Sequence, residues 1–133
     1  MEPLSINGDP PRLDGQRCDA ILCQEYWHGG RLVEPANVAF LCFEGRWYRL
    51  YFDFGIVFWR NSEDGPEPFR APEISSEYPV VDVAKKRGLR GLKLLGYRME
   101  PLADCGARVT FEFDGGTRLA FRSVDDVTTY GDA

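Results

Sequence analysis

One histidine and four cysteines are the side chains of this sequence best suited to acid–base, nucleophilic or metal chemistry. His28 follows two aromatic residues and precedes two glycines, at the expected end of a strand, where functional side chains often lie. A general acid or base needs geometric partners, and no local motif supplies them. Cys18, Cys23, Cys42 and Cys105 contain only one loose pair, whereas structural zinc sites show tight paired spacings. We therefore expect no metal, no cofactor and no catalytic residue.

The triplet Asp53-Phe54-Gly55 has the same letters as the metal-binding motif of protein kinases. The chain, however, has 133 residues and lacks both a glycine-rich phosphate loop and a catalytic-loop motif. The triplet is better explained as a turn in which Asp53 bonds local backbone and Gly55 relieves strain.

Large rings are concentrated between residues 40 and 59, where nine of the 18 aromatic residues lie. Trp47, Tyr51 and Trp59 share one alternation, opposite to Tyr48 and Leu50, provided that the alternation continues through the turn at 53–55. We favour burial of both faces, because rings supply most of a small core. The alternative is that the tryptophan face is an exposed patch for a partner protein or a ligand.

Six basic residues and no acidic one lie between Lys85 and Arg98, which leaves a charge of −11 on the remainder of a chain whose net charge is −5. A strand that exposes Arg90 and Lys93 would suit phosphate, but the run lacks an aromatic stacking pair and the acidic remainder would repel a polyanion. We expect no nucleic-acid partner. We expect the run to pair with the acidic segment 61–79, within the chain or in a homodimer.

The elements that must position these residues are mainly strands. A hairpin is predicted from Ala107 to Ser123, because apolar and polar residues alternate on both sides of a glycine pair. A three-stranded meander is predicted from Asn37 to Arg60, with its first strand central because that strand is apolar on both faces. This meander must supply most of the core.

The other segments are less regular. Residues 18–27 fit a helix or a strand, and we favour the strand; Glu34-Pro35 indicates a loop into the meander. Residues 61–79 hold four prolines and five acidic residues, which predicts a long surface loop. Residues 80–83 predict a strand, and the glycines among residues 88–96 favour bent strands over helix.

Together these segments predict an all-β fold in which about seven short antiparallel strands form a partly open barrel or sandwich, with at most one short helix. The length predicts a single domain over residues 1–133. The first eight residues lack a secretory signal, and no apolar run approaches membrane-spanning length. We therefore expect a cytoplasmic protein with reduced cysteines and no membrane partner.

An acidic chain with an aromatic-rich sheet and no assembled catalytic motif favours a noncatalytic protein-binding module. A toxin-neutralising immunity protein is one example, by analogy of class, because a small acidic chain suits the covering of a basic toxin site. The alternative is a small enzyme or ligand-binding protein with a pocket beside the 37–60 meander, built from His28, Tyr51, Asp53 and Arg60. A cavity that holds two or more of these side chains would favour the alternative.

Overall fold

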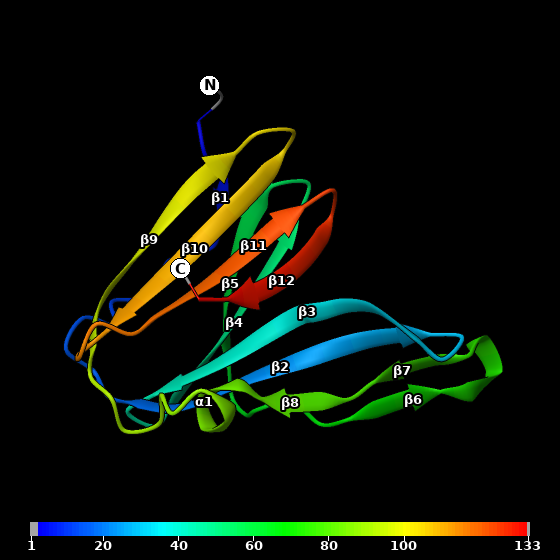
Figure 1. Ribbon diagram of the computed structural model, residues 1–133, viewed down its shortest axis with the longest axis horizontal. Helices are drawn as coiled ribbons and strands as arrows, with labels where there is room; N and C mark the ends of the chain where they lie inside the picture. The colour runs from blue at the N-terminus through cyan, green and yellow to red at the C-terminus, as the bar shows by residue number, and fades with distance from the viewer. Residues whose placement is uncertain (1–2, 133) are drawn as a thin grey trace.

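Two β-sheets make up most of residues 3–132, which are the residues that the computed structural model describes (Figure 1). The first sheet has the order β1-β5-β4-β3-β2-β7-β6, with β8 also paired to β2, and the second has the order β12-β11-β10-β9. All pairs are antiparallel except β1 with β5. The strands within these residues are β1 (Ile6–Asn7), β2 (Cys18–His28), β3 (Arg31–Phe43), β4 (Arg46–Asp53), β5 (Ile56–Ser62), β6 (Phe69–Ala71), β7 (Ser76–Tyr78), β8 (Val80–Asp82), β9 (Leu94–Leu102), β10 (Gly106–Phe113), β11 (Arg118–Val124) and β12 (Val127–Gly131).

The all-β prediction with one short helix is confirmed, and the sheets pack as a sandwich rather than closing into a barrel. The hairpin at 107–123 and the three-stranded meander are both present, with β3 central between β2 and β4. Residues 18–27 form strand, as favoured. The predicted number of strands, about seven, was too low, because β1, β6, β7 and β12 were not predicted.

Four hairpins turn over two residues, and in each turn both residues have positive φ: Gly29-Gly30, Glu44-Gly45, Phe54-Gly55 and Asp125-Asp126. Two-residue turns of this kind match the right-handed twist of the strands that they join. They also fix the register between neighbouring strands, and this register decides which side chains face the core.

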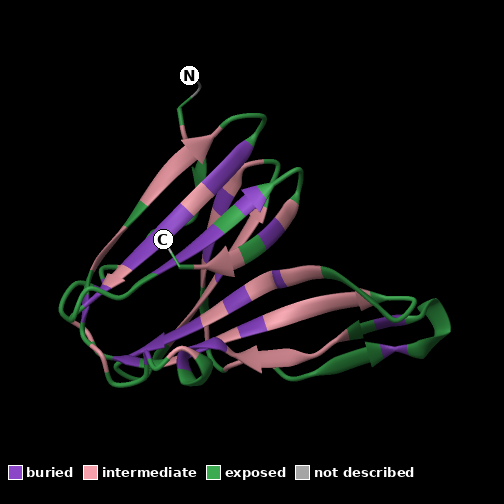
Figure 2. Cartoon of the chain, in the orientation of Figure 1, coloured by how far each residue is buried: buried purple, intermediate pink, exposed green. Residues whose placement is uncertain are grey.

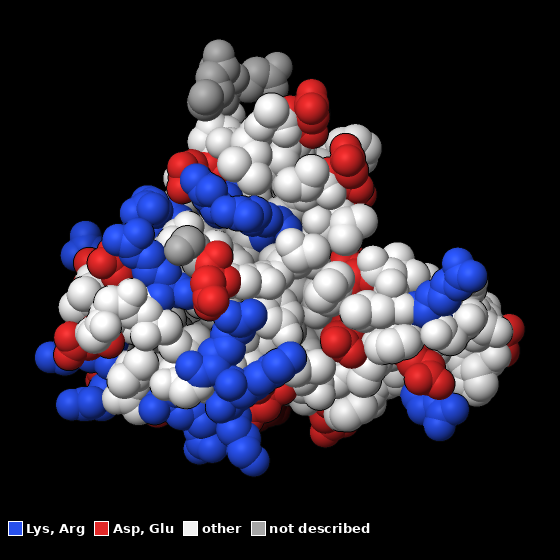
Figure 3. All heavy atoms as spheres, viewed as in Figure 1, with Lys and Arg blue, Asp and Glu red and all other residues white. Residues whose placement is uncertain are grey.

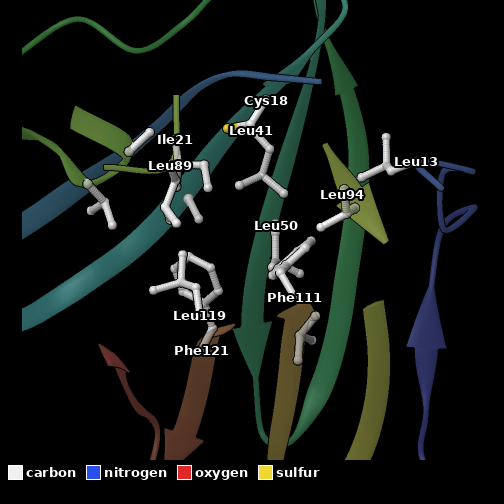
Figure 4. Close-up of a cluster of buried hydrophobic side chains, with 14 of the residues drawn as sticks. Leu13, Cys18, Ile21, Leu41, Leu50, Leu89, Leu94, Phe111, Leu119 and Phe121 are labelled. Atoms are coloured by element: carbon white, nitrogen blue, oxygen red, sulfur yellow. The ribbon is translucent and has the colours of Figure 1, made fainter. Parts of the chain in front are cut away.

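The core lies between the two sheets. Figure 4 shows Leu41 and Leu50 from the first sheet pointing toward Phe111 and Phe121 from the second. Trp59 is 1% exposed, and its ring centroid lies 5.3 Å from that of Tyr97. Complete burial of each large apolar side chain contributes about 1.5–3 kcal/mol, so these facing side chains hold the two sheets together.

A short helical segment follows β8. Asp82 caps α1 (Val83–Lys86) by accepting a hydrogen bond from the Lys85 amide at 2.9 Å, and Val83 and Ala84 are buried. Leu89 is also buried, in a turn, and the strand predicted for residues 89–99 begins only at Leu94. Among residues 3–132, no helix has the length and apolar character needed to cross a membrane.

The first sheet continues beyond the second as a projection, visible at the right of Figure 1. We call this projection the arm and define it as residues 25–36 and 69–78, which include the ends of β2 and β3, strands β6 and β7, and η1 (Pro72–Ile74). Figure 2 shows that the arm is mainly exposed or half-buried, in contrast to the sandwich. Most of the arm therefore presents both faces of a sheet to solvent. At its base the arm meets the second sheet, because Glu34 accepts a hydrogen bond from the Thr128 amide of β12 and Ala36 is buried.

The arm overturns two predictions. Residues 61–79 are not one long loop, because β6, η1 and β7 form a small hairpin on the edge of β2. These strands have three residues each, too few for a clear alternation, and Pro68 and Pro72 flank a strand at a sheet edge, where a missing N–H is tolerated. Glu34-Pro35 also lies within β3, beside a bulge in which residues 35–37 lie opposite Glu25.

Candidate functional site

Trp59 does not share a face with Trp47 and Tyr51, so this prediction was wrong. The turn between β4 and β5 has two residues, and Leu50 therefore pairs with Trp59 across the strands. Leu50 faces the core, and Trp59 faces it too, donating from Nε1 to the sulfur of Met99 at 3.3 Å. Trp59 is a core residue.

Trp47, Tyr51 and Arg60 lie on the outer face of the first sheet, away from the second sheet. The ring of Tyr51 stacks on Phe58 with centroids 4.9 Å apart, and the Arg60 guanidinium lies 5.6 Å from the centre of the Phe58 ring. Arg60 also donates to the carbonyl oxygens of Trp59 and Asn7. Arg60 thus links β1 to the outer face of the sheet, and Trp47, Tyr51 and Arg60 are each half-buried.

Asp53 is exposed at the end of β4, next to the turn that the sequence predicted for the Asp-Phe-Gly triplet. Gly55 has φ of +73°, as the turn prediction requires. The Phe54 amide donates to Asp126 Oδ1 at 3.3 Å, so this turn bonds a neighbouring turn of the second sheet.

Arg90 and Lys93 are exposed in the segment between α1 and β9. Two residues of the basic run form ion pairs. Arg87 pairs with Asp132 at 2.6 Å, and Arg98 pairs with Glu100 at 3.5 Å. Within the described residues no ion pair joins this run to 61–79, so the predicted pairing within the chain was wrong. Figure 3 shows most Lys and Arg side chains gathered over α1 and the nearby end of the sandwich, with fewer on the arm.

All four cysteines are free; Cys18, Cys23 and Cys42 are buried and Cys105 is exposed. Burial raises the pKa of the Cys18 and Cys23 thiols to about 12, and it raises the pKa of Cys42 as well. A buried protonated thiol is a poor nucleophile and a poor metal ligand. Among residues 3–132, no group of three or more histidine, cysteine or acidic side chains is placed to hold a metal.

A hollow of about 490 Å³ lies where hairpin turns of the two sheets meet, lined in part by Leu4, Phe54, Leu102 and Cys105. A second hollow, of about 330 Å³, lies on the arm. Neither contains any of the four side chains proposed for an enzymatic pocket. His28 lies on the arm, whereas Tyr51, Asp53 and Arg60 lie on β4 and β5, and neither hollow brings the four side chains together.

The arm carries a row of aromatic rings on one face. Tyr26 stacks on Tyr78 with centroids 5.2 Å apart, and Phe69 continues the row at 5.9 Å from Tyr78. His28 lies at the other end, 6.5 Å from Tyr26, with Nδ1 3.3 Å from the hydroxyl of Ser76. Because side chains alternate along a strand, the row lies on the same face of β2 as Leu22, the outer face. His28 is thus the one predicted site residue on the arm.

Comparison with known proteins finds no family model, curated protein or solved structure that matches this chain. The function must therefore be inferred from the residues themselves.

The opposite face of the arm carries Trp27. Its indole Nε1 donates to Glu25 Oε1 at 2.9 Å, and the strand register places Glu77 next to Trp27 and Arg70 next to Glu77. Trp27, Arg70, Pro72 and Glu77 line the hollow of about 330 Å³. The arm thus combines a ring row on one face with a concave, charged site on the other.

Sequence reasoning missed most of the arm residues. Tyr26, Trp27, Phe69 and Tyr78 were not singled out; Phe69 and Tyr78 fall in segment 61–79, which was predicted to be a loop. One signal was present in the sequence: Tyr26-Trp27-His28 lies directly before Gly29-Gly30, which indicates that these rings lie near the tip of a hairpin.

Proposed function

We propose that this chain is a noncatalytic protein-binding module that holds its partner on the arm. The observation that supports this proposal is the row of rings from Phe69 to His28 on a sheet that projects beyond the sandwich. Leu32, Val33, Phe69 and Ile74, all on the arm, are 42–58% exposed. Exposed apolar patches on small proteins often mark interaction sites, and aromatic anchors carry much of the energy of an interface.

Charge indicates what kind of partner the arm suits. The arm and the adjoining loop 61–68 together carry seven carboxylates and two arginines, a net charge of −5 that equals the charge of the whole chain. The carboxylates are Glu25, Glu34, Glu63, Asp64, Glu67, Glu73 and Glu77, and the arginines are Arg31 and Arg70. Complementary charge speeds association and selects partners, so we propose a basic protein, such as a toxin that an immunity protein would neutralise.

Two further observations support a binding role without catalysis. The candidate catalytic groups His28, Asp53 and Arg60 lie on separate parts of the first sheet. The four thiols are free, which suits the reducing cytoplasm that we propose as the site of action.

Affinity capture from the native host tests the proposal. The bait is the wild-type chain, compared with the double variant Phe69→Ser, Ile74→Ser and with a matched control, Leu95→Ser, Val124→Ser. All four side chains are 45–58% exposed, so neither variant should disturb the core. We expect one specific partner, retained by the wild type and the control and reduced at least about tenfold by the arm variant. Equal retention by both variants, or no specific partner at low salt, would overturn the proposal.

A further inference from the structure

The hollow on the arm has an indole ring held in a fixed position. Trp27 is half-buried, and its hydrogen bond to Glu25 restrains the ring and keeps a carboxylate at its edge. Gly29 and Gly30, which also line the hollow, have no atom within 4 Å of the position that a β-carbon would occupy. The indole therefore lines a hollow that has open space beside the hairpin turn.

A negatively charged side chain lies beside the indole in the same hollow. Glu77 is next to Trp27 across the β2–β7 pair, and its side chain is 53% exposed. A cation above an indole is attracted by the ring face, and a carboxylate beside that position adds a charge-assisted hydrogen bond. A planar guanidinium can make both interactions at once.

Arg70 provides an example within the chain of a guanidinium that pairs with Glu77. Its guanidinium nitrogen lies 3.4 Å from Glu77 Oε1, and its side chain is 73% exposed. An ion pair this exposed is weak, typically about 0–1 kcal/mol, so a stronger ligand can displace Arg70 from Glu77.

We propose that the hollow lined by Trp27, Pro72 and Glu77, with Glu25 hydrogen-bonded to the Trp27 indole, is a binding site for an arginine side chain of a basic partner protein. This inference rests on the proposed function and deepens it, since it names the group that the arm recognises. Arg70 is an internal competitor that partly fills the site when no partner is bound. The volume of about 330 Å³ leaves room for one such side chain.

Titration of the ¹⁵N-labelled protein with an acetylated, amidated tetra-arginine peptide tests the site. The chain has three tryptophans, and loss of one indole signal in Trp27→Phe assigns Trp27. We expect the Trp27 indole resonance to shift and saturate, while those of Trp47 and Trp59 remain fixed and report that the fold is intact. A tetra-glutamate peptide should shift none of them.

Three variants distinguish this site from general attraction to an acidic surface. Glu77→Gln should weaken tetra-arginine binding about fivefold, and Arg70→Gln should strengthen it about threefold, because it removes the competitor. Glu112→Gln, which removes a carboxylate of similar exposure from an ion pair on the second sheet, should leave the affinity unchanged.

The inference is overturned if tetra-arginine leaves the Trp27 resonance unmoved, if Arg70→Gln weakens binding, or if Glu77→Gln and Glu112→Gln have equal effects. Such a result leaves the proposed function intact if Phe69→Ser, Ile74→Ser still abolishes partner capture. Conversely, tetra-arginine binding with no effect of that double variant on capture would contradict the proposed function alone.

Discussion

A β-carbon on Gly55 would lie 2.4 Å from the carbonyl oxygen of Cys105. The turn between β4 and β5 in the first sheet therefore touches the turn between β9 and β10 in the second, backbone against backbone. The hydrogen bond from Phe54 N to Asp126 Oδ1 joins a third turn to these two. The end of the sandwich is closed by three turns, and the space between the first two admits only glycine.

This contact predicts an unequal effect of two glycine substitutions. Gly55→Ala combines a residue with φ of +73° with a clash against backbone, so we expect a loss of unfolding free energy of about 3 kcal/mol or more. Gly116→Ala is the matched control, because its φ is +87° but no atom lies within 4 Å of the added carbon. Its loss should be only about 1–2 kcal/mol. Urea unfolding measures both, and equal losses would show that the turns do not touch.

The four thiols should differ sharply in reactivity. Cys105 is exposed, whereas Cys18, Cys23 and Cys42 are buried with raised pKa values that keep them protonated. Labelling of the native protein with Ellman's reagent should consume one thiol per chain, and labelling in denaturant should consume four. Cys105→Ser should remove the native reaction completely. Rapid native labelling of that variant would mean that the core opens.

The strands of the sandwich could be predicted from the sequence where one face of the strand is buried and the other faces solvent. In β10, Val109, Phe111 and Phe113 alternate with polar residues, and all three are buried, so period-two patterning, together with the glycine pair that follows, located the hairpin. β3 was predicted to be central for a related reason, because a strand buried on both faces reads as a continuous apolar run.

The face of Trp59 could not be predicted in the same way. Its assignment required the number of residues in the turn before β5, and a shift of one residue moves every side chain to the other face. The structure has a two-residue turn, Phe54-Gly55, where the sequence was interpreted as a turn of three residues, 53–55. Phe54 at φ of +49° is the cause, since an aromatic residue rarely adopts positive φ and gave no signal.

The arm escaped prediction because little of it is buried. A strand of three residues at a sheet edge, such as Phe69–Ala71, has no buried face that would require apolar and polar residues to alternate. The prolines and charged residues in and around it resemble those of a loop. The sequence therefore predicted only part of the candidate site: it identified His28 and missed the aromatic rings beside it.

Stability should depend on pH through Glu34. Its side chain accepts a hydrogen bond from the Thr128 amide at 2.7 Å, yet burial is the larger effect and raises its pKa above the usual 4.5. As the pH rises past 4.5, the unfolded chain releases this proton before the folded chain does, so ionisation of Glu34 lowers the free energy of unfolding. The loss accumulates from that pH up to the raised pKa of the folded state and then stays constant.

Glu34→Gln isolates this effect, because the amide oxygen still accepts from Thr128 and carries no charge. The difference in unfolding free energy, wild type minus variant, should fall as the pH rises above 4.5 and then become constant. Urea unfolding at several pH values measures it, and Glu112→Gln serves as a control on an exposed carboxylate. A difference that rises with pH would show that the bond to Thr128 outweighs burial.

The register of β4 and β5 makes a final prediction about two tryptophans. Trp59→Leu removes an indole packed against Tyr97 and Phe111 and leaves a cavity between the sheets, so we expect a loss of about 3–5 kcal/mol of unfolding free energy. Trp47→Leu removes a half-buried ring from the outer face and should cost about 1–2 kcal/mol. Acrylamide should also quench the fluorescence of Trp47 more strongly than that of Trp59. Variants that keep only one of these tryptophans allow the two signals to be measured separately. Equal losses and equal quenching would mean that both rings share one face, as the alternation of the sequence had suggested, and that the turn at Phe54-Gly55 is longer than two residues.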